Sequence, residues 1–218
     1  MLFRSVSQSR YLLATLYLIL VSHEPISNIR LLGVKCLVYK PSTGKWNLDI
    51  YKQVLFGLGH CDQNIVFLAE HDVLYPHDYY ASCLKKIKFG YVNYAQNTYM
   101  LNALGYWTYR PSVFQSTCFG EKSKLIEATQ FKINTIEGGE NPKSFDIGAG
   151  DFQLREYFNT NPVLDIRHEY NATVTGTADK SQKIEHKIEY WGEAQFLISR
   201  LGLTKTHGII HSEDGRKS

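Results

Sequence analysis

The most constraining feature of this sequence is an apolar segment that breaks into acidic residues, NIVFLAEHDVLYP at residues 64–76. Residues 65–69 are all apolar, which is typical of a strand buried on both faces in the middle of a parallel sheet. Glu70 and Asp72 follow directly, one residue apart. In open α/β sheets ligands bind in the crevice outside the carboxyl ends of the strands, so we expect both carboxylates at a ligand-binding edge.

Two acids at such an edge favour cation-assisted phosphate chemistry. Hard divalent cations such as Mg²⁺ and Mn²⁺ prefer carboxylate oxygens, and one or two protein carboxylates commonly hold them together with substrate phosphates. The same residues also fit a strand that ends in a polar turn, with Pro76 opening a helix and Asp72 near its N-terminus. A two-residue acidic signature does not decide between these interpretations.

Length and composition indicate a single globular domain. The chain has 218 residues, of which 44% are hydrophobic and 21% charged, and it carries no long acidic or basic block. We expect one domain over residues 1–212 and a frayed tail over 213–218. A formal net charge of +3 is too small to indicate nucleic acid or an anionic membrane as a partner.

The four cysteines indicate neither a zinc site nor a disulfide scaffold. Cys36, Cys61, Cys83 and Cys118 are widely spaced and form no CxxC pair. Buried thiols in a reducing compartment are the simpler interpretation, so we expect a cytoplasmic protein.

The first long apolar run is predicted to be a strand. Residues 11–21 are too short for a bilayer span, which needs about 20 apolar residues. They resemble the apolar region of a signal peptide, but the following Ser22-His23-Glu24-Pro25 lacks the small-x-small pattern of a signal-peptide cleavage site. We expect a short polar lead and then a buried strand over residues 15–21. The polar turn after it should lie at the same sheet edge as Glu70 and Asp72.

The remaining pattern alternates strands and helices. Trp46, Ile50, Val54 and Leu58 recur every four residues and predict an amphipathic helix over 46–60. The other expected elements are a strand within 28–38, a turn at 41–44, a helix over 76–87, two antiparallel strands within 91–109, a strand over 112–119, a short helix over 122–129, a glycine-rich loop over 137–151, a helix over 151–158, a strand over 163–168, a polar segment over 171–187 and a helix over 190–201.

Taken in order, these features resemble the GT-A glycosyltransferases, and more narrowly the family-2-like enzymes found in phage and bacterial genomes. The residues that carry the resemblance are the buried strand ending in Glu70-His71-Asp72, the Tyr- and Asn-rich hairpin, the glycine-acid loop and Asp165-Ile166-Arg167-His168. The resemblance covers roughly residues 15–201. It implies an α/β fold of the GT-A type, a Rossmann-like mixed sheet with flanking helices.

The resemblance also implies a function and its residues. Such enzymes move a sugar from a nucleotide-diphosphate sugar, most often a UDP-sugar, to a hydroxyl acceptor, here with inversion. An acidic motif at a strand end binds Mn²⁺ or Mg²⁺, which grips the donor diphosphate; Asp72, Glu70 and a distant His168 would fill that role. Ser22 and Glu24, in the turn after the first strand, would contact the nucleotide. Glu in place of the usual first Asp leaves open whether Glu70 touches the metal, the ribose or neither.

An inverting transferase needs a general base for the acceptor hydroxyl, and a carboxylate is the usual choice. Asp151 and Glu140 both lie in the glycine-rich loop, and Asp146 is a third candidate. Asp151 is ranked first because its position resembles the acceptor-side acid of the family. It could equally be the N-cap of the helix predicted after it.

Two other function classes compete with this hypothesis. A nucleotidyltransferase would need a glycine-rich, basic phosphate loop near the first strand, which Ser22-His23-Glu24-Pro25 does not provide. A catalytically inactive module that binds a glycan or a protein needs no such residues. The acceptor could be a glycan, a lipid, a protein or a modified DNA base, and no integral membrane span is expected.

Overall fold

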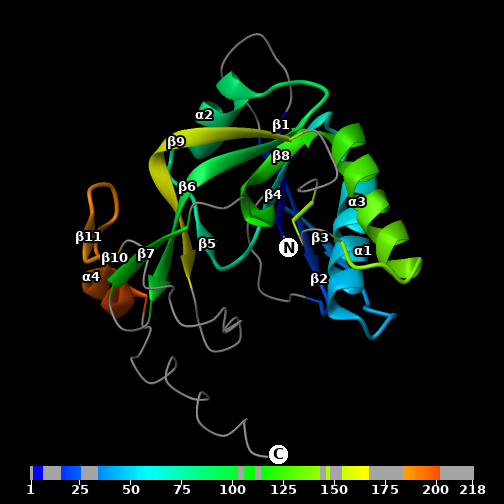
Figure 1. Ribbon diagram of the computed structural model, residues 1–218, viewed down its shortest axis with the longest axis horizontal. Coiled ribbons are helices and arrows are strands. Elements are labelled where there is room, and N and C mark those ends of the chain that lie inside the picture. Colours follow the sequence, from blue (N-terminus) through cyan, green and yellow to red (C-terminus); the bar gives the residue numbers. More distant parts are fainter. Residues whose placement is uncertain are drawn as a thin grey trace, which may run out of the picture. The chain divides into compact units, whose positions relative to one another are not determined.

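The computed structural model describes residues 2–6, 16–25, 34–102, 106–110, 114–142, 146–147, 154–166 and 184–201 (Figure 1). Its elements form a mixed α/β fold in which helices flank a multi-strand mixed sheet. The residue contacts divide the chain into two compact units. Unit 1 comprises residues 1–71, 81–96 and 113–158, and unit 2 comprises residues 72–80, 97–112 and 159–218.

The sheet of unit 1 is mixed and has β4 (Ile65–Ala69) near its middle. β4 pairs antiparallel with β1 (Leu2–Val6) and with β8 (Cys118–Glu121). β1 pairs antiparallel with β2 (Leu16–Ser22), which pairs in parallel with β3 (Val34–Val38). The first residues of β6 (Val92–Asn102) pair with β8. The expectation that β4 lies within a parallel sheet is therefore wrong, although all five of its residues are buried as predicted.

Antiparallel pairing is compatible with the apolar sequence of β4 because both of its faces are covered. On one face, Val66 and Leu68 join the main hydrophobic core. On the other, the ring of Phe67 stacks on Phe119 of β8 with 5.1 Å between the ring centroids. A continuous apolar run indicates burial on both faces, and it carries no information on the direction of the neighbouring strands.

Helices α1 (Trp46–Gly59) and α3 (Lys122–Glu137) lie side by side over this core (Figure 1). The predicted helix over 46–60 is confirmed almost residue for residue. α3 continues eight residues beyond the predicted end at 129, because Ile133 and Ile136 extend its buried face. The two helices are linked by an ion pair between Lys52 and Glu137, with 2.7 Å between the charged atoms.

β1 was expected to be a polar lead and is a strand between β2 and β4. Leu2 pairs with Leu20 of β2 on one side and with Ala69 of β4 on the other. β2 and β4 are both antiparallel to β1, so they run in the same direction and end at the same edge of the sheet. This edge is called the carboxyl edge below.

Unit 2 is built on a hairpin formed by the last residues of β6 and by β7 (Tyr106–Arg110), as predicted. β7 also pairs with β10 (Ile184–Glu185). β5 (Val73–Leu74) pairs with the end of β9 (Leu154–Ile166), and β11 (Lys187–Ile188) pairs with β12 (Gly192–Glu193) before α4 (Ala194–Arg200). A small core around Trp107 joins these elements.

Several element predictions require correction. The predicted helix over 151–158 is wrong, since β9 begins at Leu154 and continues to Ile166. The strand predicted over 112–119 is a short 3-10 helix, η1 (Gln115–Thr117), followed by β8. Helix α2 (Tyr79–Lys86) begins three residues after Pro76 instead of at it, and α4 begins at Ala194 instead of 190.

No helix in the described parts of the chain is both long and apolar enough to cross a membrane.

Candidate functional site

The carboxyl edge of unit 1 gathers the polar residues that follow β2 and β4. Ser22 ends β2, and its Oγ donates a hydrogen bond of 2.5 Å to the carbonyl of Glu24, whose side chain is exposed. Glu70 follows β4 and is half-buried. The common pairing of Leu20 and Ala69 with Leu2 places these two strand ends level with each other. The prediction that the turn at residues 22–25 shares a sheet edge with Glu70 and Asp72 is confirmed for Glu70 alone, since Asp72 belongs to unit 2.

Helix α1 fixes the position of this edge. The buried side chain of Gln53 donates a hydrogen bond of 3.0 Å through Nε2 to the carbonyl of Val21, at the end of β2. On the next strand, the backbone N–H of Tyr39 donates to the carbonyl of Ser22 at 2.8 Å. Both bonds satisfy backbone groups at the end of β2, so the turn that follows starts from an anchored position.

Asp49, in the first turn of α1, organises the predicted turn at 41–44. Its Oδ1 accepts hydrogen bonds from the backbone N–H groups of Ser42 at 3.1 Å and Thr43 at 3.2 Å. Burial raises the pKa of this carboxyl, but the hydrogen bonds from Ser42 and Thr43 outweigh burial and leave the pKa below its usual value. Asp49 is therefore held as a carboxylate and has a structural role in the turn.

Asp146 is a further carboxylate that the structure places beside the end of β4. Its Oδ1 accepts a hydrogen bond of 2.9 Å from the N–H of Gln115, in η1. Because Phe67 pairs with Phe119, η1 lies just beyond the paired part of β8 and next to the last residues of β4. Ile147 is fully buried in the core of unit 1 and anchors this segment.

Asp146 is the third of the candidate bases predicted from the sequence. The sequence signal that could have ranked Asp146 higher is the apolar Ile147 beside it, within an otherwise glycine- and polar-rich stretch.

Burial raises the pKa of Tyr51 on α1, and the negative charge of Asp146 raises it further. The Tyr51 hydroxyl therefore stays protonated near neutral pH.

Of the two leading candidate bases in the glycine-rich loop, the structure describes Glu140 but not Asp151. Glu140 is exposed and directly follows the end of α3. Gly139 has a φ of +85°, its N–H donates to the carbonyl of Ile136, and the N–H of Glu140 donates to the carbonyl of Thr135. This is a Schellman cap, so the first two glycines of the predicted site loop terminate a helix. Asp151 lies outside the described residues.

The predicted metal ligands are not assembled into one group in the described structure. Asp72 is 9% exposed and its carbonyl accepts a 2.8 Å hydrogen bond from the N–H of Ile166 on β9. The boundary between the units falls between His71 and Asp72, so Glu70 belongs to unit 1 and Asp72 to unit 2. His168 lies outside the described residues. Within the described ranges, no three His, Cys, Asp or Glu side chains are grouped so that they could hold a metal ion.

No protein-family profile, no curated protein and no solved structure matches this chain. The best-supported candidate site is the carboxyl edge, because it combines a capped polar turn, a half-buried carboxylate and anchored strand ends.

Proposed function

We propose that the chain is a metal-dependent glycosyltransferase that moves a sugar from a nucleotide-diphosphate sugar, most readily a UDP-sugar, to a hydroxyl acceptor with inversion. The observation that carries this proposal is the carboxyl edge. There, Ser22 and Glu24 after β2 lie at the same edge as Glu70 after β4, on two strands that run in the same direction. Crevices at such strand ends are the usual ligand sites of α/β sheets.

The turn after β2 would bind the nucleoside part of the donor. The Ser22 hydroxyl donates to the Glu24 carbonyl and can accept a hydrogen bond from a ligand, and the exposed carboxylate of Glu24 can accept hydrogen bonds from ribose hydroxyls. Gln53 and Tyr39 anchor the end of β2 and so keep this turn in place without touching the ligand. A fixed turn binds more tightly because less conformational entropy is lost on binding.

A hard divalent cation would be held through carboxylate oxygens, the ligands that such a cation prefers. Glu70 and Asp72 offer carboxylate oxygens, and Mg²⁺ needs only one or two of these when phosphate oxygens and waters complete its shell. Asp72 would be the principal ligand, Glu70 a second, and His168 a nitrogen ligand suited to Mn²⁺. The bound cation would stabilise the negative charge that develops on the leaving diphosphate.

A carboxylate would act as the general base. It would take the proton from the acceptor hydroxyl as that oxygen attacks the anomeric carbon, and the bond to the diphosphate breaks with its electron pair leaving on the phosphate oxygen. Asp151 and Glu140 are the candidates from sequence, and the side chain of Glu140 is exposed, so it would be accessible to an acceptor. Asp146 is tied to the backbone of Gln115, which favours a positioning role.

The proposal is tested by sugar-nucleotide turnover in the wild type and in Asp72→Ala. We expect the variant to lose at least about 100-fold of the Mn²⁺-dependent consumption of the donor, as removal of one charge-stabilising contact commonly does. Asp62→Ala is the matched control, because Asp62 is exposed and lies at the opposite end of β4. Circular dichroism of both variants would show that the fold is retained.

Two outcomes would contradict the proposal. Undiminished turnover in Asp72→Ala, or full activity in EDTA, would exclude the metal role of Asp72. Absence of any thermal stabilisation by UDP, GDP, CDP or TDP, with and without Mn²⁺, would favour a module that binds without catalysis.

A further inference from the structure

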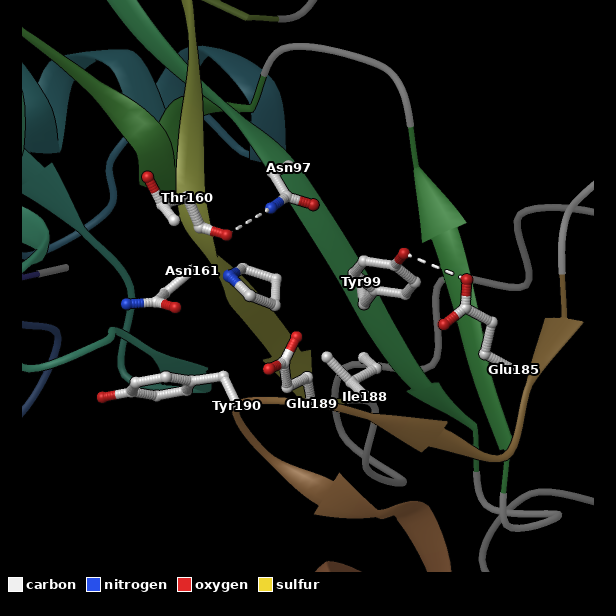
Figure 2. A pocket seen from close by; sticks show the side chains of 9 residues that line it. Asn97, Tyr99, Thr160, Asn161, Glu185, Ile188, Glu189 and Tyr190 are labelled. Atoms are coloured by element: carbon white, nitrogen blue, oxygen red, sulfur yellow. Dashed lines mark hydrogen bonds between the residues drawn. The ribbon is translucent and has the colours of Figure 1, made fainter.

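Unit 2 contains a pocket of about 650 Å³ that the proposed transfer reaction does not use (Figure 2). A volume of this size is within the range of about 300–1,000 Å³ that small-molecule sites occupy. Its walls come from the middle of β6, the middle of β9 and the segment from β10 to the turn after β11. The lining residues are Asn97, Tyr99, Thr160, Asn161, Pro162, Glu185, Ile188, Glu189 and Tyr190.

The lining is polar and lacks positive charge. It offers two amides, two carboxylates, an aliphatic hydroxyl and two phenols, together with the apolar Pro162 and Ile188. It includes neither lysine nor arginine. Amide and hydroxyl groups both donate and accept hydrogen bonds, and carboxylates accept them from hydroxyl donors. Such a set suits an uncharged ligand with many hydroxyl groups, and it disfavours anions because Glu185 and Glu189 would repel them.

Hydrogen bonds fix one wall of the pocket. The hydroxyl of Tyr99 donates to Oε1 of Glu185 at 3.3 Å, as Figure 2 shows. The side chain of Asn97 donates through Nδ2 to the carbonyl of Asn159 at 2.9 Å. These contacts hold polar groups from three strands in place before any ligand arrives.

The opposite wall is fixed around Tyr190. The backbone N–H of His77 donates to the Tyr190 hydroxyl at 3.1 Å, and the two rings stack with an angle of 13° between their planes. The indole N–H of Trp191 donates to the carbonyl of Pro162 at 2.7 Å. Asn161 donates to Asp78 at 3.3 Å. Preorganised side chains lower the entropic cost of binding.

Two unfavourable features occur in the strands that line this pocket, one in a lining residue and one in the residue before a lining residue. Asn97 has a φ of +81° within a strand, a left-handed conformation that costs about 1–3 kcal/mol in a residue with a side chain. Asn159 precedes Thr160 in β9 and is 3% exposed, and neither polar atom of its amide has a hydrogen-bond partner in the described protein. Strain and unsatisfied buried groups of this kind concentrate at binding sites, because packing alone would select against them.

We propose that this pocket binds a neutral saccharide. Sugar hydroxyls would pair with Thr160, Asn161 and Glu189, whose side chains border the pocket (Figure 2). The inference rests on the lining of unit 2 and needs neither a nucleotide nor a cation. It therefore stands or falls separately from the proposed transferase activity.

Saturation-transfer NMR on the full chain tests the inference. The probes are glucose, galactose, mannose and N-acetylglucosamine with the disaccharides maltose, lactose and chitobiose, all without nucleotide or divalent cation. We expect at least one of these neutral sugars to give saturation transfer. Glucuronate and sialic acid should give none, because the two carboxylates of the lining repel them.

Two lining variants and a matched control locate the binding. Glu189→Ala and Thr160→Val remove exposed polar groups that border the pocket, and each should weaken sugar binding at least about 5-fold. Glu193→Ala removes an exposed carboxylate of unit 2 that is not part of the lining, and should leave binding unchanged. Both lining positions are on the surface, so the fold should survive.

Three results would overturn the inference. The first is no saturation transfer from any neutral sugar, and the second is equal affinity of the wild type and both lining variants. The third is binding of a lysine- and arginine-containing peptide in place of every sugar, which would assign the acidic lining to a cationic partner.

Discussion

The two units of this chain are stabilised in different ways. The core of unit 1 is formed by aliphatic and aromatic side chains from four strands and two helices, with Val54, Leu58 and Leu125 fully buried. The core of unit 2 is a small cluster around Trp107. Unit 2 also contains the left-handed Asn97 and the unpaired amide of Asn159. Among the described residues, the one non-glycine residue with a positive φ therefore lies in unit 2, at its pocket.

This difference indicates how stability and ligand binding are divided between the two units. A large apolar core tolerates polar residues at its edges, and the carboxyl edge of unit 1 is such a place. Unit 2 has fewer buried apolar groups to offset its strain, so it should open locally at a lower free energy than unit 1. The three predictions below test this comparison, beginning with the largest expected effect.

Trp107→Ala should destabilise unit 2 by about 3–5 kcal/mol, because it removes the largest buried side chain of that core. It also leaves the carbonyl of Gly192 without its 3.2 Å hydrogen bond from the indole. Hydrogen exchange monitored by mass spectrometry should show protection lost first in β7, β11 and α4. Leu58→Ala is the matched control in unit 1 and should reduce protection in α1. An equal loss of hydrogen-exchange protection in both units for both variants would contradict the separate stabilisation of the two units.

Asn97→Ala should cost about 1–3 kcal/mol, because alanine is strained at a φ of +81° and cannot donate to the carbonyl of Asn159. Asn97→Gly loses the same hydrogen bond but adopts positive φ without strain. Urea denaturation should therefore show that the glycine variant is more stable than the alanine variant. Equal stability of the two variants would show that this residue is not strained.

Asp49→Asn should have the smallest effect, and the effect should depend on pH. The pKa of Asp49 is lowered in the folded state, so its carboxylate contributes stability above the unfolded value of about 3.9. That contribution is lost as the pH falls through the lower, folded value. The difference in unfolding free energy between the wild type and Asp49→Asn should have its full value at pH 7 and become smaller below pH 4. Asp62→Asn, at an exposed carboxylate, should show no comparable change.

The sequence predicted elements whose pattern is local. Trp46, Val54 and Leu58 specify α1 by their spacing, and the apolar run of β4 specifies a strand buried on both faces. Residues 106–110 form the second strand of the predicted hairpin. Each of these signals lies within a dozen residues, where propensity and periodicity are most informative.

The sequence failed where the decisive partner is distant. A helix was predicted over 151–158, with aromatic residues available for packing. Tyr157 instead packs near Phe119 of β8 and Asn161 bonds to Asp78, so tertiary contacts select a strand. The insertion of β1 between β2 and β4 likewise depends on long-range pairing. At the candidate site, Glu70 and the turn after β2 were placed correctly, whereas the contact of Asp146 with Gln115 required the folded chain. The pocket of unit 2 draws on three separate segments and has no local signature.

The continuity of β6 and β9 has a consequence for how this protein can be divided. Both strands begin in unit 1 and end in unit 2, and the chain changes unit five times along its length. A single cleavage at any of these points divides at least one of the two units between the fragments. Neither unit is a continuous segment of the chain, so neither could be fused to another protein or exchanged by itself. Recombination between related genes would have to preserve both units together.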